Sequence, residues 1–408
     1  SPRLATKTTE ELQRYAEQYG IQTTGSREDL LIKLRPFGKG LTHRYPPPKP
    51  LPLAPLPFKF SDLKKAIPQH CFERNLVTSM SYLISDVMTM AALAWMASFI
   101  EWGTLPSGVS TILWPVYWFC QGTKMFALWM LAHECGHQAF SDITVVNHTV
   151  GLFCHSVLLV PYFSWQLTHA KHHRYTGSCE NDVGFCPPLR SDLVSEVSNE
   201  MPVVQAISIV VMLTFGWMPG YLFFNTTGPK SNKGHHKSHF NPWAKMFEER
   251  HRVDIIISDL GFFATICGLA YLVHITSFGV VARFYIVPYM VTNLYLVLIT
   301  FLQHTDVFMP RFRGKDFDWL RGALCTADRS LGSVIDYLIH HSADTHVCHH
   351  LFSKMPFYNA KEATVHIKKS LGDYYLFDPT PIHKALWRAF TCCRFIEDEG
   401  GTVFFKAE

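Results

Sequence analysis

Three short groups of histidines are the residues of this sequence whose type and spacing could do chemistry. The chain has 22 histidines among 408 residues, and eight of them stand three or four residues apart within the groups. On a helix, such neighbours share one face about 5–6 Å apart, so each group predicts imidazoles that point the same way. Imidazole is the commonest metal ligand in proteins and suits iron, copper, nickel and zinc. The groups are His133–His137, His169–His173 and His346–His350.

Eight histidines are more than one metal ion can use, because tetrahedral zinc takes four ligands at most. They suffice for two ions. The first group also reads His133-Glu134-Cys135-Gly136-His137, which matches the HExxH pattern of zinc proteases. A membrane zinc protease would need one further ligand and would leave the other two groups without a role. We therefore favour a two-metal site and keep the protease as a remote alternative.

The composition predicts a membrane protein with sizeable polar parts. Apolar residues make up 48% of the chain and charged residues 17%, whereas soluble chains are about a quarter charged. The net charge of +4 is too small to indicate a nucleic-acid-binding protein. The 11 cysteines are odd in number and irregularly spaced, which favours buried thiols in a reducing compartment.

Long apolar segments alternate with the histidine groups. A helix needs about 20 residues to cross a hydrocarbon core of about 30 Å. Two pairs of segments meet this requirement as hairpins, and two weaker segments are interrupted by polar residues or by glycine and proline. The hairpins are 79–100 with 108–132, and 255–278 with 283–303, and the weaker segments are 144–162 and 203–225.

The number of crossings follows from the need for all three groups to meet at one site. An even number of crossings must separate the groups, which excludes 144–162 and 203–225 as membrane spans. The Gly216–Gly220 break suits an interfacial or re-entrant helix. Residues 1–75 hold 13 basic and 7 acidic residues, and this excess predicts a cytosolic N-terminus. We expect an all-α integral membrane protein with four transmembrane helices in two hairpins, interfacial or re-entrant helices, and a cytosolic helical cap that holds the histidines.

The N-terminal part is expected to be organised differently. Residues 1–40 predict a small helical segment, since Thr8–Glu11 and Ser26–Asp29 are typical helix starts. Its spacing loosely resembles the SAP helix-turn-helix motif, which binds DNA in other proteins, so a membrane-anchored nucleic-acid-binding protein is the alternative from another class. We favour local packing and expect no nucleic-acid partner. A proline-rich linker is predicted at 41–61, and a single membrane domain at 62–408.

The histidine groups, their order and their distances resemble the membrane-bound fatty acid desaturases over about residues 62–385. The resemblance is closest to the acyl-lipid Δ12 (oleate, omega-6) branch, which lies near the omega-3 desaturases. The strings that carry it are HECGHQAFS at 133–141, LITFLQHT at 298–305, WLRGAL at 319–324 and DTHVCHHLFS at 344–353.

This resemblance implies a site of two iron ions that activates O₂ and removes two hydrogens from an acyl chain. It also implies His304 as a ninth ligand, because that position carries a ligating histidine in the family. A relative that acts on acyl-CoA has an Asn four residues before this position, where this chain has Thr300. The expected metal ligands are His133, His137, His169, His172, His173, His304, His346, His349 and His350.

Two acidic residues beside these histidines are candidates for a supporting role. Glu134 and Asp344 could each accept a hydrogen bond from an imidazole and so fix its tautomer. His340 and His341 are close to the third group but miss its helical spacing, so they are not expected to be ligands. No catalytic residue is expected beyond the metal site and these two acids.

The resemblance also implies a substrate and redox partners. The sequence has no nucleotide-binding glycine-rich loop after a strand and no HPGG haem signature, so electrons must come from outside. A separate cytochrome b5 with its reductase is implied, or a ferredoxin in a plastid. The expected reaction is O₂-dependent insertion of a cis double bond into the oleoyl chain of a membrane glycerolipid to give linoleoyl. An omega-3 (Δ15) desaturase and a Δ12 hydroxylase or acetylenase stay open as alternatives. The expected location is the endoplasmic reticulum membrane, with a plastid membrane as the alternative.

Overall fold

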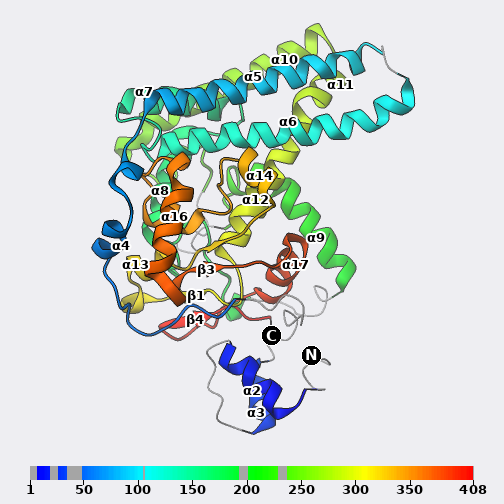
Figure 1. The fold of residues 1–408 in the computed structure, drawn as a ribbon. Helices are drawn as coiled ribbons and strands as arrows, with labels where there is room; N and C mark the ends of the chain where they lie inside the picture. Colours follow the sequence, from blue (N-terminus) through cyan, green and yellow to red (C-terminus); the bar gives the residue numbers. More distant parts are fainter. Residues whose placement is uncertain are drawn as a thin grey trace.

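The computed structural model describes residues 7–18, 26–34, 48–103, 106–192, 201–227 and 237–407. Over these ranges the chain is mostly helical and carries two small two-stranded sheets (Figure 1). The predicted all-α class is therefore confirmed.

Within these described ranges, four helical stretches are long and apolar enough to cross a membrane, judged by length and composition. Three of them correspond to the predicted segments 79–100, 255–278 and 283–303. The stretches are α5 (Leu76–Glu101), α9 (Pro202–Phe215) with η4 (Gly216–Tyr221), η6 (Glu249–His251) with α10 (Arg252–Ile275), and α11 (Phe278–Val281) through η7 (Ala282–Ile286) to α12 (Val287–His304).

The fourth stretch differs from the sequence prediction. Sequence analysis assigns a crossing to 108–132, but the helix there, α6 (Ser107–Gly136), is not among the four, whereas 202–221 is. Polar side chains such as Gln121 and Lys124 lower the mean hydropathy of α6. These side chains lie in a half of the helix that is buried against other parts of the protein almost without interruption. A helix can therefore lie at the centre of the bundle, as α6 does, without being apolar enough to be recognised as a membrane span.

The two weaker segments also form helices. α7 (Thr144–Ser156) has 13 residues and is about 20 Å long, too short to cross a hydrocarbon core of about 30 Å. The predicted break near residue 218 is present, because Met218, within η4, has non-helical backbone angles (φ −120°, ψ 118°).

α6 is the central helix of the long-helix part, where it packs against α5, α7 and α12. Figure 1 shows α5, α6, α7 and α10 together on one side of the molecule. Arg283 of η7 joins the ends of the two hairpins, since it donates to Glu101 at 2.5 and 2.7 Å. The indole N–H of Trp118 also donates to the Arg283 carbonyl oxygen at 3.0 Å.

Short elements form the remaining part of the molecule around the histidines. Two pairs of strands connect chain segments far apart in sequence: β1 (Pro310–Phe312) is antiparallel to β4 (Thr402–Phe404), and β2 (Ala327–Asp328) is parallel to β3 (Leu376–Phe377). The helices are α4 (Phe60–Ala66), η2 (Gln69–Phe72), α8 (Tyr162–Tyr175), η3 (Arg190–Asp192), η8 (Gly314–Asp316), α13 (Trp319–Ala323), α14 (Ser333–Leu338), α15 (His346–Leu351), α16 (Phe357–Leu371), η9 (Gly372–Tyr374) and α17 (Ile382–Cys392).

The two predicted N-terminal helices are present. Thr8 Oγ1 accepts the N–H of Glu11 at 3.2 Å, and Ser26 Oγ accepts the N–H of Asp29 at 3.2 Å, so both helices start with the expected caps. The start of the predicted linker at 41–47 lies outside the described residues. The division at residues 40 and 61 stays a prediction. The two helices are α2 (Thr9–Gln18) and α3 (Arg27–Leu34).

Four fully buried charged residues hold α17 to the segments that follow α12. Arg388 donates to Asp306 at 2.7 Å and to Asp378 at 2.6 Å. Arg329 donates to Asp306 at 2.7 Å and also pairs with Asp378. Each carboxylate therefore meets both guanidinium groups, and this charge quartet (Asp306, Arg329, Asp378 and Arg388) satisfies its charges internally.

Candidate metal centre

Helices from four parts of the chain bring all nine predicted histidines together. α6 supplies its C-terminal end, α8 its second half, α12 its last residue and α15 its whole length. Two adjoining groups result. Group one contains His133, His137, His169, His173 and His349, whose nitrogens lie within 4.8 Å of one another. Group two contains His172, His304 and His350 within the same distance, with His346 in contact.

The Nε2 atoms of group one face one another. His133 Nε2 lies 2.9 Å from His169 Nε2 and 3.2 Å from His137 Nε2. His173 Nε2 lies 3.1 Å from His169 Nε2. The buried Nε2 of His349 has no hydrogen-bond partner within the described residues.

Group two has the same arrangement around His304. Its Nε2 atom lies 3.3 Å from His172 Nε2 and 3.0 Å from His346 Nε2. His346 Nε2 in turn lies 3.1 Å from His350 Nε2. His304, which belongs to none of the three sequence groups, therefore stands at the centre of group two.

This donor set fits metal ions better than it fits hydrogen bonding. A neutral imidazole has one N–H and one acceptor nitrogen, so a network of facing Nε2 atoms leaves several lone pairs without a proton. Nitrogens bound at about 2.1 Å to one ion stand about 3 Å apart when their bonds are perpendicular. The observed separations of 2.9–3.3 Å match that spacing in both groups. The residues present can accordingly hold two metal ions.

Burial keeps these imidazoles neutral. Burial and the neighbouring histidines lower the pKa of His169, His173, His346 and His350 well below its ordinary value. The pKa of His349 falls to about 3 for the same two reasons. Neutral imidazole is the form that binds a metal, so the site is in its ligating state at neutral pH.

Asp182 orients one of the candidate ligands. Its Oδ1 lies 2.7 Å from His172 Nδ1, and its Oδ2 accepts from Arg311 at 3.2 Å. Burial acts to raise the pKa of Asp182, but His172 and Arg311 outweigh it and the pKa is lowered. An ionised carboxylate at Nδ1 directs the Nε2 lone pair toward the other histidines. Sequence reasoning missed Asp182, because no helical interval connects it to the second group.

The two predicted carboxylates lie in different environments. Glu134 Oε1 is 3.2 Å from His133 Nδ1 and 4.0 Å from His349 Nδ1, so it contacts two histidines of group one. Asp344 instead lies 3.1 Å from His341 Nδ1. The structure thus places Asp344 against a histidine outside both groups, where it cannot fix the tautomer of a candidate ligand.

Two residues outside α15, Asp328 and Thr176, form hydrogen bonds to it that the sequence did not reveal. Asp328 Oδ1 accepts the N–H of Val347 at 2.8 Å, while its Oδ2 accepts from the hydroxyl of Tyr375 at 2.5 Å. Burial raises the pKa of Asp328 to about 7. Further along the helix, Thr176 Oγ1 lies 3.2 Å from His350 Nδ1. These contacts hold a helix of only six residues in one orientation.

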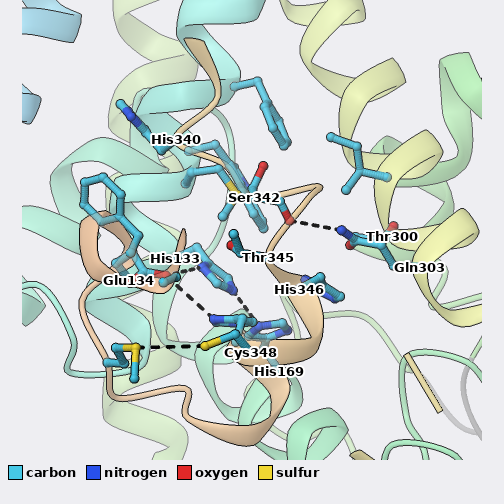
Figure 2. Close-up of a pocket in the computed structure, with 18 of the residues that line it drawn as sticks. His133, Glu134, His169, Thr300, Gln303, His340, Ser342, Thr345, His346 and Cys348 are labelled. Atoms are coloured by element: carbon cyan, nitrogen blue, oxygen red, sulfur yellow. Dashed lines mark hydrogen bonds and ion pairs between the residues drawn. The ribbon is translucent and has the colours of Figure 1, made fainter. Parts of the chain in front are cut away.

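Two cavities adjoin the histidines. The first, of about 50 Å³, lies between α6, α12 and residues 340–360 and has mainly apolar walls. The second, of about 180 Å³, is lined by η4 and by residues 184–185 and 226–227. Figure 2 shows the first cavity, with His133, His169 and His346 along one side. Both cavities are lined by Trp129, His169, Thr300 and His346.

Comparison with known families agrees with this architecture. The family model described as fatty acid desaturase matches residues 112–380, and a domain of unknown function matches residues 48–95. The first match covers well over half of the chain and includes all nine histidines. The chain belongs to the fatty acid desaturase family and is therefore an oxidoreductase that acts on fatty acyl chains.

Individual relatives match over most of their length. The Delta(12) fatty acid desaturase of Mortierella alpina is 43% identical over 366 residues, which cover 86% of this chain and 90% of that protein. The omega-6 fatty acid desaturase, endoplasmic reticulum isozyme 1, of Glycine max is 42% identical over 93% of this chain and 96% of its own. The Delta(12)-fatty-acid desaturase of Arabidopsis thaliana is 43% identical over 88% and 91%.

Proposed function

We propose that the protein is a Δ12 acyl-lipid desaturase, which inserts a cis double bond into the oleoyl chain of a membrane glycerolipid with O₂ as co-substrate. The observation that carries this proposal is the pair of adjoining all-histidine groups beside apolar cavities. The assignment to the Δ12 position is supported by relatives at 42–43% identity that are named Delta(12) or omega-6 desaturases.

The nine histidines are the proposed ligands of two iron ions. When bound, the iron ions supply the O₂ activation that breaking an unactivated C–H bond requires. Soft thiolate ligands contribute nothing to either group, and imidazole suits iron among the transition metals. Asp182 and Glu134 hold the ligand tautomers through Nδ1 of His172 and His133.

Two tryptophans help this chain to exclude water from the site. Trp165 stacks on His169 with ring centres 4.5 Å apart, and Trp129 stacks on His133 at 5.6 Å. Both indoles are buried. A dry site prevents side reactions of an oxidising intermediate with water, and the acyl chain itself would complete the exclusion.

The substrate is expected to pass through both cavities. Thr300 lies on α12 and lines both cavities, so an acyl chain that occupies the two must pass this residue and the adjacent histidines. The walls of both cavities are mainly apolar, as an acyl chain requires, and we assign the first, between α6 and α12, to the methyl half. The second is partly lined by Thr226 and Thr227 and suits the carboxyl half, near the headgroup.

We further propose a multi-pass protein of the endoplasmic reticulum with a cytosolic active site. Electrons would come from a separate cytochrome b5 and its reductase, or from a ferredoxin if the protein is plastidial. α9 packs on the last turns of α12 and on α17, so 202–221 lies beside one end of the bundle. Accessibility tags near Arg190 and Lys245 should therefore report the same side. Opposite sides would mean that 202–221 crosses the membrane.

Expression in a yeast that lacks polyunsaturated lipids tests the reaction. The expected result is linoleate in the lipid fraction, with none from the His346→Gln variant. Product formed only when linoleate is supplied would identify an omega-3 desaturase, and a hydroxylated acid would identify the hydroxylase.

Elemental analysis of the purified protein tests the metal. Close to two irons per chain is the expected content. One zinc and no iron would contradict the desaturase proposal and favour the protease reading of the HExxH pattern.

A further inference from the structure

A second cluster of ionisable side chains is buried among the long helices, apart from the histidine groups. Asp86 of α5 forms an ion pair with Lys124 of α6, and its Oδ2 lies 2.7 Å from Nε2 of His340. The three residues are 1%, 8% and 7% exposed. Charged groups are costly to bury in a membrane protein, and they are retained mainly where they serve a function. We call this cluster the Asp86 triad.

The His340 ring is held in one position. His340 and His341 have φ of +58° and +57°, a left-handed conformation that residues other than glycine adopt rarely. Such strain persists where the surroundings determine the backbone, often beside a ligand. The ring also meets Tyr82 edge-on at 5.4 Å and Phe357 at 5.0 Å. Backbone, hydrogen bond and ring contacts thus all restrict the same imidazole.

His340 belongs to the wall of the first cavity. Figure 2 shows it on the far side of this cavity from His169 and His346, with Ser342 and Thr345 between them. An acyl chain that passed the histidine groups and entered the first cavity would therefore end against His340.

We propose that the Asp86 triad is a fixed stop at this end of the cavity, which sets how much of the acyl chain lies beyond the histidine groups. The inference rests on the proposed function, because it takes an acyl chain as the occupant. An apolar side chain in this place could change rotamer to admit a longer chain. His340 cannot move without losing its bond to Asp86, and a displaced Asp86 would leave Lys124 unpaired in an apolar region.

Competition between monoenoic chains of different length tests the stop. Cells are supplied with sixteen-, eighteen- and twenty-carbon monoenes, and the ratios of their products are measured. His340→Ala opens the end of the cavity while the Asp86–Lys124 pair remains. The product ratio of twenty- to eighteen-carbon chains should rise at least about tenfold, because the two chains differ by two methylenes and each methylene in an apolar pocket changes discrimination by about tenfold or more. His340→Gln keeps the bulk and a hydrogen-bonding group, and should keep the wild-type ratio.

A second variant changes the cavity in the opposite direction without altering the triad. Ser342 also lines the cavity, and its buried hydroxyl has no hydrogen-bond partner among the residues that the structure describes. Ser342→Val should therefore shorten the cavity without breaking a bond. The product ratio of eighteen- to sixteen-carbon chains should fall at least about tenfold, because these chains also differ by two methylenes. This variant decides the question if His340→Ala does not accumulate in membranes.

The outcome that overturns the proposal is equal loss of turnover for every chain length, or unchanged ratios, in the variants that accumulate. Either result would mean that the triad only holds α5 to α6. The exposed His383→Gln serves as the matched control and should leave the ratios unchanged. The ratios apply to whichever product the wild type makes, so a wild type that forms omega-3 or hydroxylated product contradicts the Δ12 proposal and still tests the stop.

Discussion

The charge quartet and the two histidine groups are both buried polar clusters, but their polar atoms are satisfied in different ways. In the quartet every carboxylate meets two guanidinium groups, with donor–acceptor distances of 2.6–2.7 Å for the Arg388 contacts to Asp378 and Asp306. In the histidine groups the hydrogen-bond-length contacts between histidines join Nε2 to Nε2. Only Thr305 separates His304 from Asp306, so the two kinds of cluster are almost adjacent along the chain.

The difference indicates which cluster needs a ligand. Opposite charges at hydrogen-bond distance balance the desolvation of one another. Facing imidazole nitrogens repel unless a proton or a cation lies between them, and burial disfavours the second proton that would convert His169 and His346 to imidazolium. A buried polar cluster that is complete stabilises the fold, whereas an incomplete one marks a binding site.

The largest expected effect concerns His304, the proposed ligand outside the three sequence groups. His304→Gln should abolish product formation and lower bound iron, as His346→Gln should, because the amide cannot replace an imidazole nitrogen at the centre of group two. Activity by fatty-acid profiling and iron by elemental analysis are measured. His251→Gln and His366→Gln are the controls and should keep most activity. Normal iron with more than a tenth of the activity, a barrier change below about 1.4 kcal/mol, would remove His304 from the ligand set.

Breaking the quartet should affect stability rather than chemistry. Arg388→Met leaves Asp306 and Asp378 with one guanidinium instead of two, and removing one partner of a buried pair costs about 3–5 kcal/mol. Thermal unfolding of the purified protein should show a large loss of stability, while the folded fraction keeps its iron content. Loss of iron from a chain of normal stability would contradict the separation of the two clusters.

A smaller effect is expected when a ligand loses only its orienting carboxylate. Asp182→Asn replaces the charged partner of His172 and should weaken metal affinity by about 10–100-fold. Asp344→Asn is the matched control, because Asp344 contacts His341 and no histidine of either group. Chelator titration of the two variants compares their affinities. Equal weakening of metal affinity in both variants would mean that Asp182 stabilises the fold and does not specifically orient His172.

The smallest expected effect is a difference in the pH range over which each cluster loses its contribution to stability. Five of the candidate ligands have lowered pKa values in the folded state, so the unfolded chain binds protons first as pH falls below about 6.5. These are His169, His173, His346, His349 and His350. Burial acts to raise the pKa of Asp378, but Arg329 and Arg388 outweigh it, so its contribution is lost only below about pH 4. The melting temperature of the metal-free protein should therefore decrease as the pH is lowered from about 7 to about 5. The Asp378→Asn variant should show the same change of melting temperature with pH. A flat profile in that range would contradict the neutral-histidine assignment.

The sequence alone determined the parts that depend on local spacing. Helical intervals within the histidine groups indicated shared faces, and the capping residues Thr8 and Ser26 marked the starts of two helices that the structure contains. The strings around the groups also indicated the family, to which the chain belongs. These signals are readable because each depends on residues within one or two turns of chain.

Tertiary structure decided what depends on contacts between distant segments. Asp182 reaches His172 through a loop, and Asp344 turns to His341 although it lies closer in sequence to the third group than Asp182 does to the second. The low hydropathy of α6 also depends on contacts with other helices. Lys124 is tolerated in α6 because it forms an ion pair with Asp86 of α5. A side chain's role is set by what surrounds it, and for buried polar groups the surroundings come from segments whose approach no local spacing encodes.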